Sequence, residues 1–232
     1  MNILSFIAKW VFVLCLPGLL LSTSFGLAFN SLALYEYGFE KYSISQKTGL
    51  AENELEKAAR GLISYFNSPD EFIDVTLEKD GKPLTLFNRR EAIHLKDVKG
   101  LVWLDYRILL GTLVYVLGYG GLTLFRQRGR HVRRLAGAAV WGSGLTLTAM
   151  LALGLGTLVG FDRLFLQFHL ISFANDFWQL DPAKDYLIML FPQGFWYDAT
   201  LFITLATVGM ALILAGVAGG HLWFRRNRAI LL

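Results

Sequence analysis

The chain has 232 residues, of which 54% are hydrophobic and only 17% are Asp, Glu, Lys or Arg. An ordinary soluble domain has about 25% charged residues, so this composition excludes a typical soluble protein and predicts a membrane protein. The net charge of +4 comes with arginine-rich stretches beside apolar segments, which are a topology signal more often than a nucleic-acid site. Cys15 is the only cysteine, which excludes an internal disulfide and a thiolate metal cluster.

Four apolar segments have nearly the length of a membrane-crossing helix, which needs about 20 mostly apolar residues. They are residues 10–34, 108–124, 135–160 and 198–223. The first could instead be a cleaved signal peptide with small residues near its end. Its apolar run is long for a signal and ends in no A-x-A site, so we expect it to be retained as a membrane helix.

Arginines orient the predicted crossings. The stretch FRQRGRHVRR carries five and WFRRNR carries three, and basic loops of this kind stay in the cytoplasm. We therefore expect both termini inside and the segments 35–104 and 161–197 outside. The predicted parts are a first membrane helix over 1–34, an extracytoplasmic segment over 35–104, a second membrane helix over 105–125, a cytoplasmic arginine loop over 126–134, a third membrane helix over 135–160, an extracytoplasmic interfacial loop over 161–197, a fourth membrane helix over 198–224 and a cytoplasmic tail over 225–232.

The first outer segment carries its own folding signals. AENELEKAARGLISYF places Leu55, Ala59, Leu62 and Phe66 at helical spacing with charges opposite, which predicts an amphipathic helix. IDVTLEKDGKPLTLF alternates apolar and polar residues around Asp80-Gly81, which predicts a β-hairpin. The expected fold class is an all-α membrane protein, a four-helix transmembrane bundle with a small α+β extracytoplasmic insertion and an interfacial aromatic loop.

A new helix is predicted to begin after Asn88, with Glu91 three residues on as a capping box. No proline follows in this helix, so we expect it to run unbroken into the second crossing. The loop 161–197 holds 11 aromatic residues in 37, a density typical of the headgroup level of a membrane. It is predicted to form short helices broken at Asp181-Pro182 and at Pro192.

Two of the four histidines, His94 and His169, lie in the outer segments beside membrane boundaries. Glu91 and Asp97 share a helix face with His94. These groups fit plain interfacial residues, but a neutral imidazole flanked by carboxylates also suits a general base. Glu91, His94 and His169 could hold a divalent metal, although HExxH is absent and no third strong ligand is evident.

Two blocks of sequence carry a family resemblance. NRREAIHLKDVKGL, followed after one membrane hairpin by FHLISFANDFWQLDPAKDYLIMLFPQGFWYD, resembles the bacterial lipoprotein intramolecular transacylases over nearly the whole chain. The resemblance implies an acyltransferase of the bacterial plasma membrane that works on the extracytoplasmic side. It would move the sn-2 acyl chain of a diacylglyceryl lipoprotein to the α-amine of the lipid-modified N-terminal cysteine, giving a lyso-form lipoprotein. The lipoprotein and membrane lipid are the expected partners, with no nucleic acid, cofactor or metal.

The resemblance implies that His94 and His169 are catalytic, one taking the amine proton and the other assisting the departing glycerol oxygen. Which histidine plays which role is open. Glu91, Asp97 and Asp185 would orient the imidazoles, and Asn175 would donate to the oxyanion. The full supporting set is Glu91, Asp97, Arg90, Asn175, Asp185 and Trp178.

Three alternatives stay open. In the first, Ser172 is acylated and passes the chain on, which we rank below direct transfer. In the second, the protein is a metal-dependent membrane hydrolase. In the third, residues 43–87 bind an envelope partner without catalysis. A transporter is the weakest candidate, since four helices leave little room for a pathway.

Overall fold

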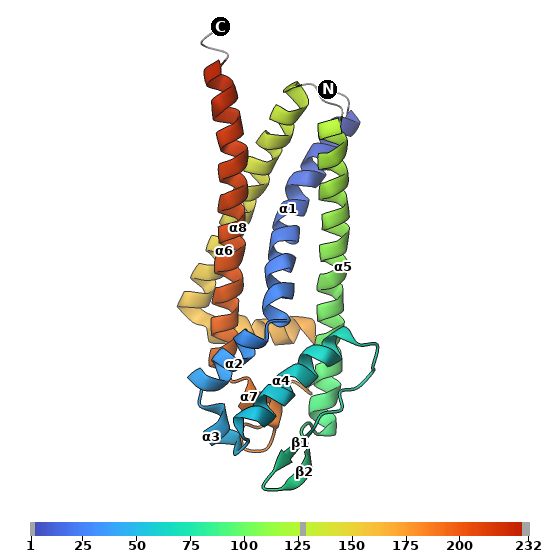
Figure 1. The fold of residues 1–232 in the computed structure, drawn as a ribbon, viewed down its shortest axis with the longest axis vertical. Helices are drawn as coiled ribbons and strands as arrows, with labels where there is room; N and C mark the ends of the chain where they lie inside the picture. Colours follow the sequence, from blue (N-terminus) through green and yellow to red (C-terminus); the bar gives the residue numbers. More distant parts are fainter. Residues whose placement is uncertain (1–2, 126–128, 229–232) are drawn as a thin grey trace. The chain divides into compact units, whose positions relative to one another are not determined.

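The computed structural model describes residues 3–125 and 129–228. Residues 126–128 of the predicted arginine loop and 229–232 of the predicted tail lie outside the described residues. The elements are α1 (Ile3–Phe29), α2 (Leu32–Lys41), α3 (Ile44–Thr48), α4 (Glu52–Asn67), β1 (Thr76–Lys79), β2 (Lys82–Thr85), α5 (Arg89–Phe125), α6 (Gly129–Ser172), α7 (Tyr186–Leu190) and α8 (Gln193–Arg228) (Figure 1). Within the described ranges, four helices are long and apolar enough to cross a membrane: α1, α5, α6 and α8. The predicted fold class is confirmed.

The chain divides into two compact units. The first comprises Met1–Phe25, Asp105–Leu155 and Ile203–Leu232, which are parts of the four long helices. Its described core is made of small and apolar side chains such as Leu16, Ala138 and Ala211. A methyl group on Gly142 would lie 2.4 Å from Leu16 Cδ1, so this glycine lets α6 approach α1 closely.

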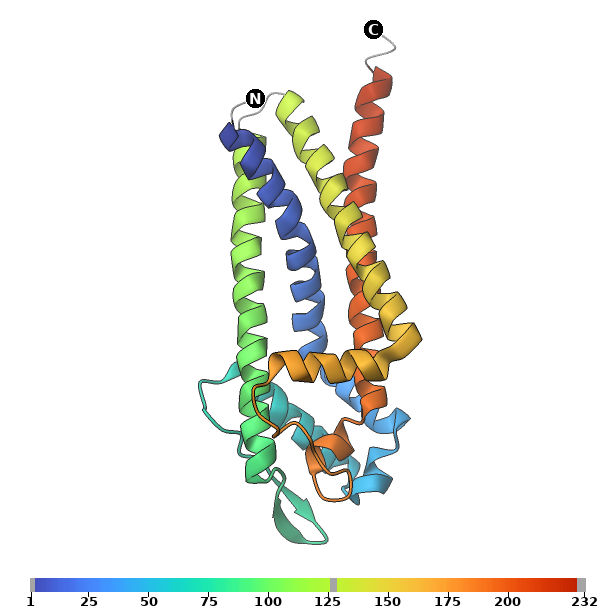
Figure 2. The ribbon, with the colours of Figure 1, turned by 180° about the vertical axis from the view of Figure 1, so that it is seen from behind.

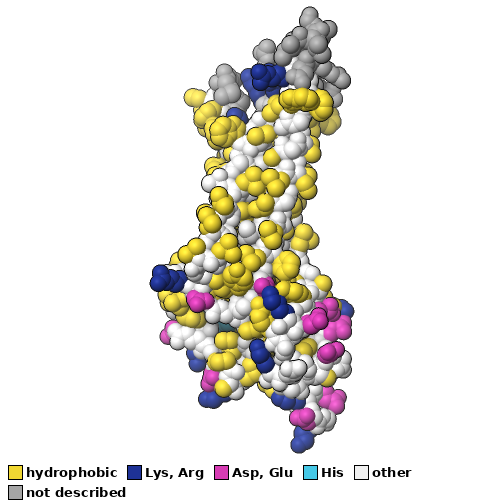
Figure 3. All heavy atoms as spheres, turned by 90° about the vertical axis from the view of Figure 1, so that its left-hand side faces the viewer, with side chains coloured by type: hydrophobic (Ala, Val, Ile, Leu, Met, Phe, Trp, Pro, Cys, Tyr) yellow, Lys and Arg dark blue, Asp and Glu magenta, His cyan; other side chains and the backbone are white. Residues whose placement is uncertain are grey.

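Asp105 is the only acidic residue in the sequence of this first unit. In Figure 3, hydrophobic and uncharged surface covers the middle of the long helices, as a lipid-facing surface requires.

The second unit comprises Gly26–Leu104 and Gly156–Phe202. The predicted amphipathic helix is confirmed as α4, and all four of its predicted core residues are buried: Leu55, Ala59, Leu62 and Phe66. The predicted hairpin is also confirmed. β1 and β2 pair antiparallel, with Lys79 opposite Lys82, and the turn residues Asp80 and Gly81 have φ of 53° and 70°. Positive φ at both turn positions matches the twist of the paired strands.

Helix α5 starts as the capping box predicts. The Asn88 N–H donates to Glu91 Oε2 (2.8 Å), and the Glu91 N–H donates to Asn88 Oδ1 (3.1 Å). The helix then runs unbroken to Phe125 (Figure 1). Its charged start, RREAIHLKDVK, precedes the apolar stretch, so His94 lies before the part of α5 that is able to cross a membrane.

Helices α1, α6 and α8 differ from the expected bounds, and α8 begins at Gln193 rather than at residue 198. Helix α1 ends at Phe29, and α2 begins at Leu32, because Asn30 and Ser31 break an apolar run that the sequence suggests is one helix to residue 34. Helix α6 leaves helical geometry at Gly160 (φ −168°, ψ 61°) but resumes and continues to Ser172. In Figure 2 the part of α6 that follows Gly160 is drawn in orange. The start of the expected loop is therefore a helix, and it carries His169.

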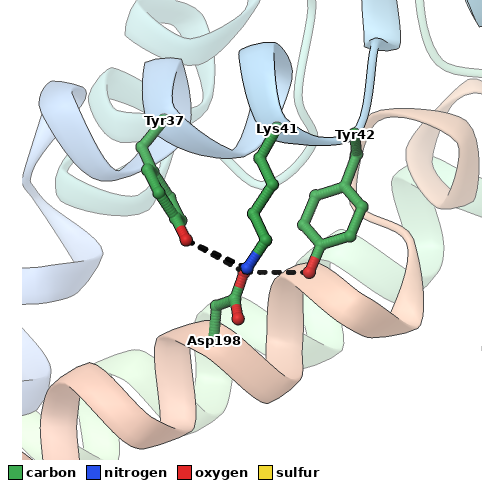
Figure 4. Close-up of polar contacts among 4 residues, drawn as sticks. All are labelled: Tyr37, Lys41, Tyr42 and Asp198. Atoms are coloured by element: carbon green, nitrogen blue, oxygen red, sulfur yellow. Dashed lines mark hydrogen bonds and ion pairs between the residues drawn. The ribbon is translucent and has the colours of Figure 1, made fainter.

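An ion pair joins α2 to the start of α8 (Figure 4). Asp198 Oδ2 accepts hydrogen bonds from Lys41 Nζ (2.7 Å) and from the Tyr42 hydroxyl (2.8 Å). Asp198 is buried, and Lys41 Nζ also donates to the Tyr37 hydroxyl (3.0 Å). Hydrogen bonds from a charged donor to a carboxylate are stronger than neutral ones. This cluster holds two elements of the second unit together at the level where α8 begins.

Candidate active site

The structure brings His94 and His169 together. Their ring centroids lie 6.1 Å apart, with an angle of 31° between the ring planes. His94 comes from the second turn of α5 and His169 from the last turn of α6, and each residue is only 7% exposed. Phe173 lies against both rings, with centroid distances of 4.9 Å to His94 and 5.5 Å to His169. Two imidazoles 75 positions apart in the sequence thus form one pair in an aromatic setting.

His169 has a defined tautomer. Its Nδ1 lies 2.7 Å from the Phe165 carbonyl oxygen. A carbonyl oxygen only accepts hydrogen bonds, so Nδ1 carries the hydrogen and the neutral ring keeps a lone pair on Nε2. The rings of Phe165 and Trp178 lie 4.3 Å and 5.0 Å from the imidazole centroid. These contacts fix the plane of the ring and leave Nε2 as its basic atom.

Both imidazoles are held in the neutral form. Burial lowers the pKa of His94 to about 4; the nearby His169 also lowers it, and the Asp97 carboxylate opposes the change. Burial likewise lowers the pKa of His169, against the hydrogen bond to the Phe165 carbonyl. Desolvation disfavours the charged form of a base, which explains both directions. The His94 Nδ1 atom is buried and has no hydrogen-bond partner, so packing and the α5 backbone hold this ring.

Glu91 lies in the first turn of α5 and is 1% exposed. Its two oxygens accept backbone hydrogen bonds, Oε2 from Asn88 N–H and Oε1 from Leu187 N–H (2.7 Å). Burial raises the pKa of Glu91; the two backbone N–H groups oppose this change, and Asp185 reinforces it. The carboxylate therefore joins the start of α5 to α7, and these two bonds direct it to backbone groups rather than to an imidazole.

Asp185 is also buried and acts at the same junction. Its Oδ1 accepts from Asn88 Nδ2 (2.8 Å) and its Oδ2 accepts from the Asp181 N–H (2.7 Å). Its side chain reaches α5 through Asn88. We expected Asp185 to help orient the imidazoles; its hydrogen bonds in the structure go to Asn88 and to the Asp181 N–H.

The remaining predicted residues tie α5 to the segment that follows His169. Asp97 Oδ2 accepts from Asn175 Nδ2 (2.9 Å). Arg90 Nη2 donates to the Asp176 carbonyl (2.8 Å), and Trp178 packs on His169 as described above. Asp97 is the carboxylate that raises the pKa of His94, so it is placed to favour a positive charge on that ring.

The structure gives the metal alternative no support. Across the described parts of the chain, no group of three or more His, Cys, Asp or Glu side chains could hold a metal ion. Glu91, the expected third ligand, directs its oxygens to backbone N–H groups. Ser172 is the last residue of α6 and is half-buried.

Four residues of this site were missed by the sequence reasoning: Asn88 as a partner of Asp185, the Phe165 carbonyl, Phe173 and the Leu187 N–H. The contact of Asn88 with Asp185 could have been suspected from the sequence. An Asn that caps a helix uses its side-chain oxygen for the helix and leaves its amide hydrogens free for another partner. The Phe165 carbonyl is four residues before His169 and follows once this stretch is known to be helical. The contacts of Phe173 and Leu187 depend on the tertiary fold and have no local signal.

Known proteins are similar to this chain in sequence and in fold. The sequence matches the family model described as lipoprotein intramolecular transacylase Lit over residues 10–196. A protein of Aquifex aeolicus (strain VF5), described as an uncharacterized protein, is 26% identical over 214 residues, which are 90% of this chain and 93% of that protein.

The fold is similar to the in meso structure of the membrane integral lipoprotein intramolecular transacylase Lit from Bacillus cereus. The TM-score is 0.78 at 20% identity, and the match covers 98% of this chain and 100% of that one. A second structure of the Bacillus cereus protein, with a histidine-to-alanine mutation, matches with a TM-score of 0.73 at 22% identity over 96% of this chain and 94% of that one. The match to the family model spans most of the sequence, and this chain therefore belongs to the lipoprotein intramolecular transacylase (Lit) family, a family of acyltransferases.

Proposed function

We propose that this protein moves the acyl chain on the sn-2 oxygen of a diacylglyceryl lipoprotein to the α-amine of the N-terminal lipid-modified cysteine of the same molecule. The product is a lyso-form lipoprotein with an N-acylated terminus. The observation that carries the proposal is the pair of buried imidazoles, His94 and His169, 6.1 Å apart in a member of this family. The chemical demands of the reaction match what such a pair offers.

The first demand is a base. An α-amine with a pKa near 8 is mostly protonated at neutral pH, and it attacks an ester carbonyl only after it loses a proton. The second demand is a donor for the glycerol oxygen that leaves. No protein nucleophile is required, because the amine and the ester belong to one molecule and reach a high effective concentration.

His169 is the base in this proposal. Its Nε2 lone pair is free because Nδ1–H is bonded to the Phe165 carbonyl. Nε2 takes a proton from the amine as the nitrogen forms its bond to the acyl carbon. The proton passes from His169 to His94, where Asp97 favours the positive charge, and His94 gives it to the glycerol oxygen as the C–O bond breaks. Both rings end neutral, and starting from the neutral amine no proton is gained or lost overall.

Asp97 and Asn175 support the charges that develop. Asp97 favours positive charge at His94, and the hydrogen bond from Asn175 fixes this carboxylate. The Asn175 amide has two hydrogens, and the bond to Asp97 uses one of them. The second is our candidate donor to the tetrahedral oxyanion, a contact of a kind that is worth about 10²–10³ in kcat in other acyl-transfer enzymes.

The reaction takes place at a membrane surface in this proposal. The chain is a membrane protein, and we place both termini and the arginine loop in the cytoplasm by the positive-inside rule. The imidazole pair then faces the extracytoplasmic side, where the diacylglyceryl group of a lipoprotein lies in the outer leaflet. The lipoprotein is the substrate, and membrane lipid surrounds the site.

Mass spectrometry of a reporter lipoprotein tests the proposal. Cells that lack other N-acylating enzymes would carry wild-type, His94→Ala or His169→Ala protein, and the N-terminal lipopeptide would be analysed. Wild type should give an N-acylated peptide with one acyl chain on the glyceryl group, and each variant should give the diacylglyceryl peptide with a free amine. The same acylation pattern in all three strains would contradict the proposal.

A further inference from the structure

The first three turns of α5 are joined to the segment 175–187 by side-chain contacts on both sides of His94 in the sequence. These contacts are Asn88 Nδ2 with Asp185 Oδ1 at 2.8 Å, Leu187 N with Glu91 Oε1 at 2.7 Å, Arg90 Nη2 with the Asp176 carbonyl at 2.8 Å and Asn175 Nδ2 with Asp97 Oδ2 at 2.9 Å. The segment follows directly after the helix that carries His169. The contacts therefore connect the backbones that carry the two imidazoles.

Asn88 is the bridge in this arrangement. Its Oδ1 accepts from the Glu91 N–H and caps α5, while its Nδ2 donates to Asp185. Asp185 is 8% exposed, and its second oxygen accepts from the Asp181 N–H. Both oxygens of this buried carboxylate are thus used, one on α5 and one on its own loop.

His94 has no hydrogen bond of its own at Nδ1. Its ring packs against Phe173 and His169, and the α5 backbone carries it. His94 lies six residues after Asn88, which is about 9 Å along a helix. A change of about 1 Å at a reacting group can lower a rate about hundredfold, so the anchoring of the first turn matters to the imidazole pair.

We infer that Asn88 and Asp185 are positioning residues for acyl transfer. Their hydrogen bond fixes the start of α5 against the segment after His169, and thereby holds His94 at its working distance from His169. The inference rests on the proposed function. It differs from a role for Asp185 on an imidazole, because the carboxylate acts through Asn88.

Single exchanges break the contact in defined ways. In Asn88→Asp, a carboxylate at position 88 faces Asp185, with the buried Glu91 carboxylate close by. In Asp185→Asn, the amide at position 185 has one oxygen for two donors, Asn88 Nδ2 and the Asp181 N–H. We expect either variant to lower kcat about tenfold or more with little change in KM, because the substrate contacts are retained.

The double exchange Asn88→Asp with Asp185→Asn restores the contact with reversed polarity. The amide at position 185 donates to the carboxylate at position 88 and still accepts from Asp181, and the carboxylate still caps α5. The measurement is the steady-state rate of the full-length protein in micelles with a synthetic diacylglyceryl lipopeptide. We expect the double variant to recover to within about threefold of wild type. A double variant as slow as the slower single variant, or single variants at the wild-type rate, would overturn the inference.

A matched control and a second readout separate this inference from the proposed function. Asp162 is exposed and accepts from Gln193 Nε2 (2.9 Å), so Asp162→Asn makes the same Asp-to-Asn exchange at a carboxylate outside this contact and should keep the wild-type rate. The second readout is the ring ¹³C signal of His94, which should move in each single variant and return in the double variant. If wild type transfers no acyl chain, the proposed function fails. In that case, a His94 signal that returns to its wild-type position in the double variant still supports the positioning contact between Asn88 and Asp185. A signal that does not return refutes this contact.

Discussion

Acidification tests the burial of His94, which sets the protonation state of the imidazole pair. The perturbation is a pH titration from about 8 to 3.5 of the purified protein with ¹³C-labelled histidine. The structure puts the pKa of His94 at about 4, against an ordinary value of 6.5. The difference corresponds to about 3 kcal/mol in favour of the neutral ring in the folded state. Because the folded pKa is the lower one, this contribution to stability is complete above pH 6.5 and is lost as the pH falls towards 4.

Nuclear magnetic resonance measures the pKa of His94 directly. The chain has only four histidines, and the His94 signal is identified as the one that is missing in the variant His94→Gln. We expect the His94 signal to titrate near pH 4, well below an exposed imidazole. In Asp97→Asn the midpoint should fall further, since Asp97 is the carboxylate that raises this pKa. A midpoint near 6.5 in the wild type, or no change in Asp97→Asn, would refute the reasoning that buries and neutralises this ring.

Three further predictions concern residues around the site. Ser172→Ala should keep the wild-type rate of transfer, because direct attack by the amine needs no hydroxyl; an acyl-enzyme trapped at this position would contradict that. Asp198→Ala should lower the free energy of unfolding, measured by thermal unfolding, by about 1–2 kcal/mol, since Lys41 and Tyr42 both lose this acceptor. Lys41→Met should cost less because the Lys41 side chain is 43% exposed. Gly38→Ala should lower the free energy of unfolding by about 1–3 kcal/mol in thermal unfolding, because its added methyl would lie 2.4 Å from the Phe195 ring. Melting temperatures of Asp198→Ala and Gly38→Ala equal to that of the wild type would contradict both predictions.

The local features of the fold could be predicted from the sequence. The capping box at Asn88 and Glu91 and the turn at Asp80-Gly81 depend on neighbouring residues, and short-range signals of this kind survive in the folded protein. The apolar run that predicts the third crossing ends at Gly160, but the helix does not end there. It leaves helical geometry at Gly160 and resumes to Ser172, with His169 in its last turn.

The site was only partly predictable. Spacing alone cannot place His94 beside His169; the residues left this pairing open beside a plain interfacial role, and the family resemblance favoured it. The position of Glu91 three residues before His94 suggested a partner of the imidazole, since such residues share a helix face. The cap draws one oxygen of Glu91 back to Asn88, and the distant Leu187 N–H takes the other. Sequence spacing identifies the face on which a carboxylate lies but not the donor that it finds there.

The central claim is that the two imidazoles act as one unit in acyl transfer. Single-turnover rates with a diacylglyceryl lipopeptide test it for wild type, His94→Ala, His169→Ala and the double variant. Each single change should lower the rate about 10²–10⁴-fold. The double variant should be little slower than the slower single one, because groups that share one step are not additive. Rates of the single variants near wild type, or losses that multiply in the double variant, would contradict the account.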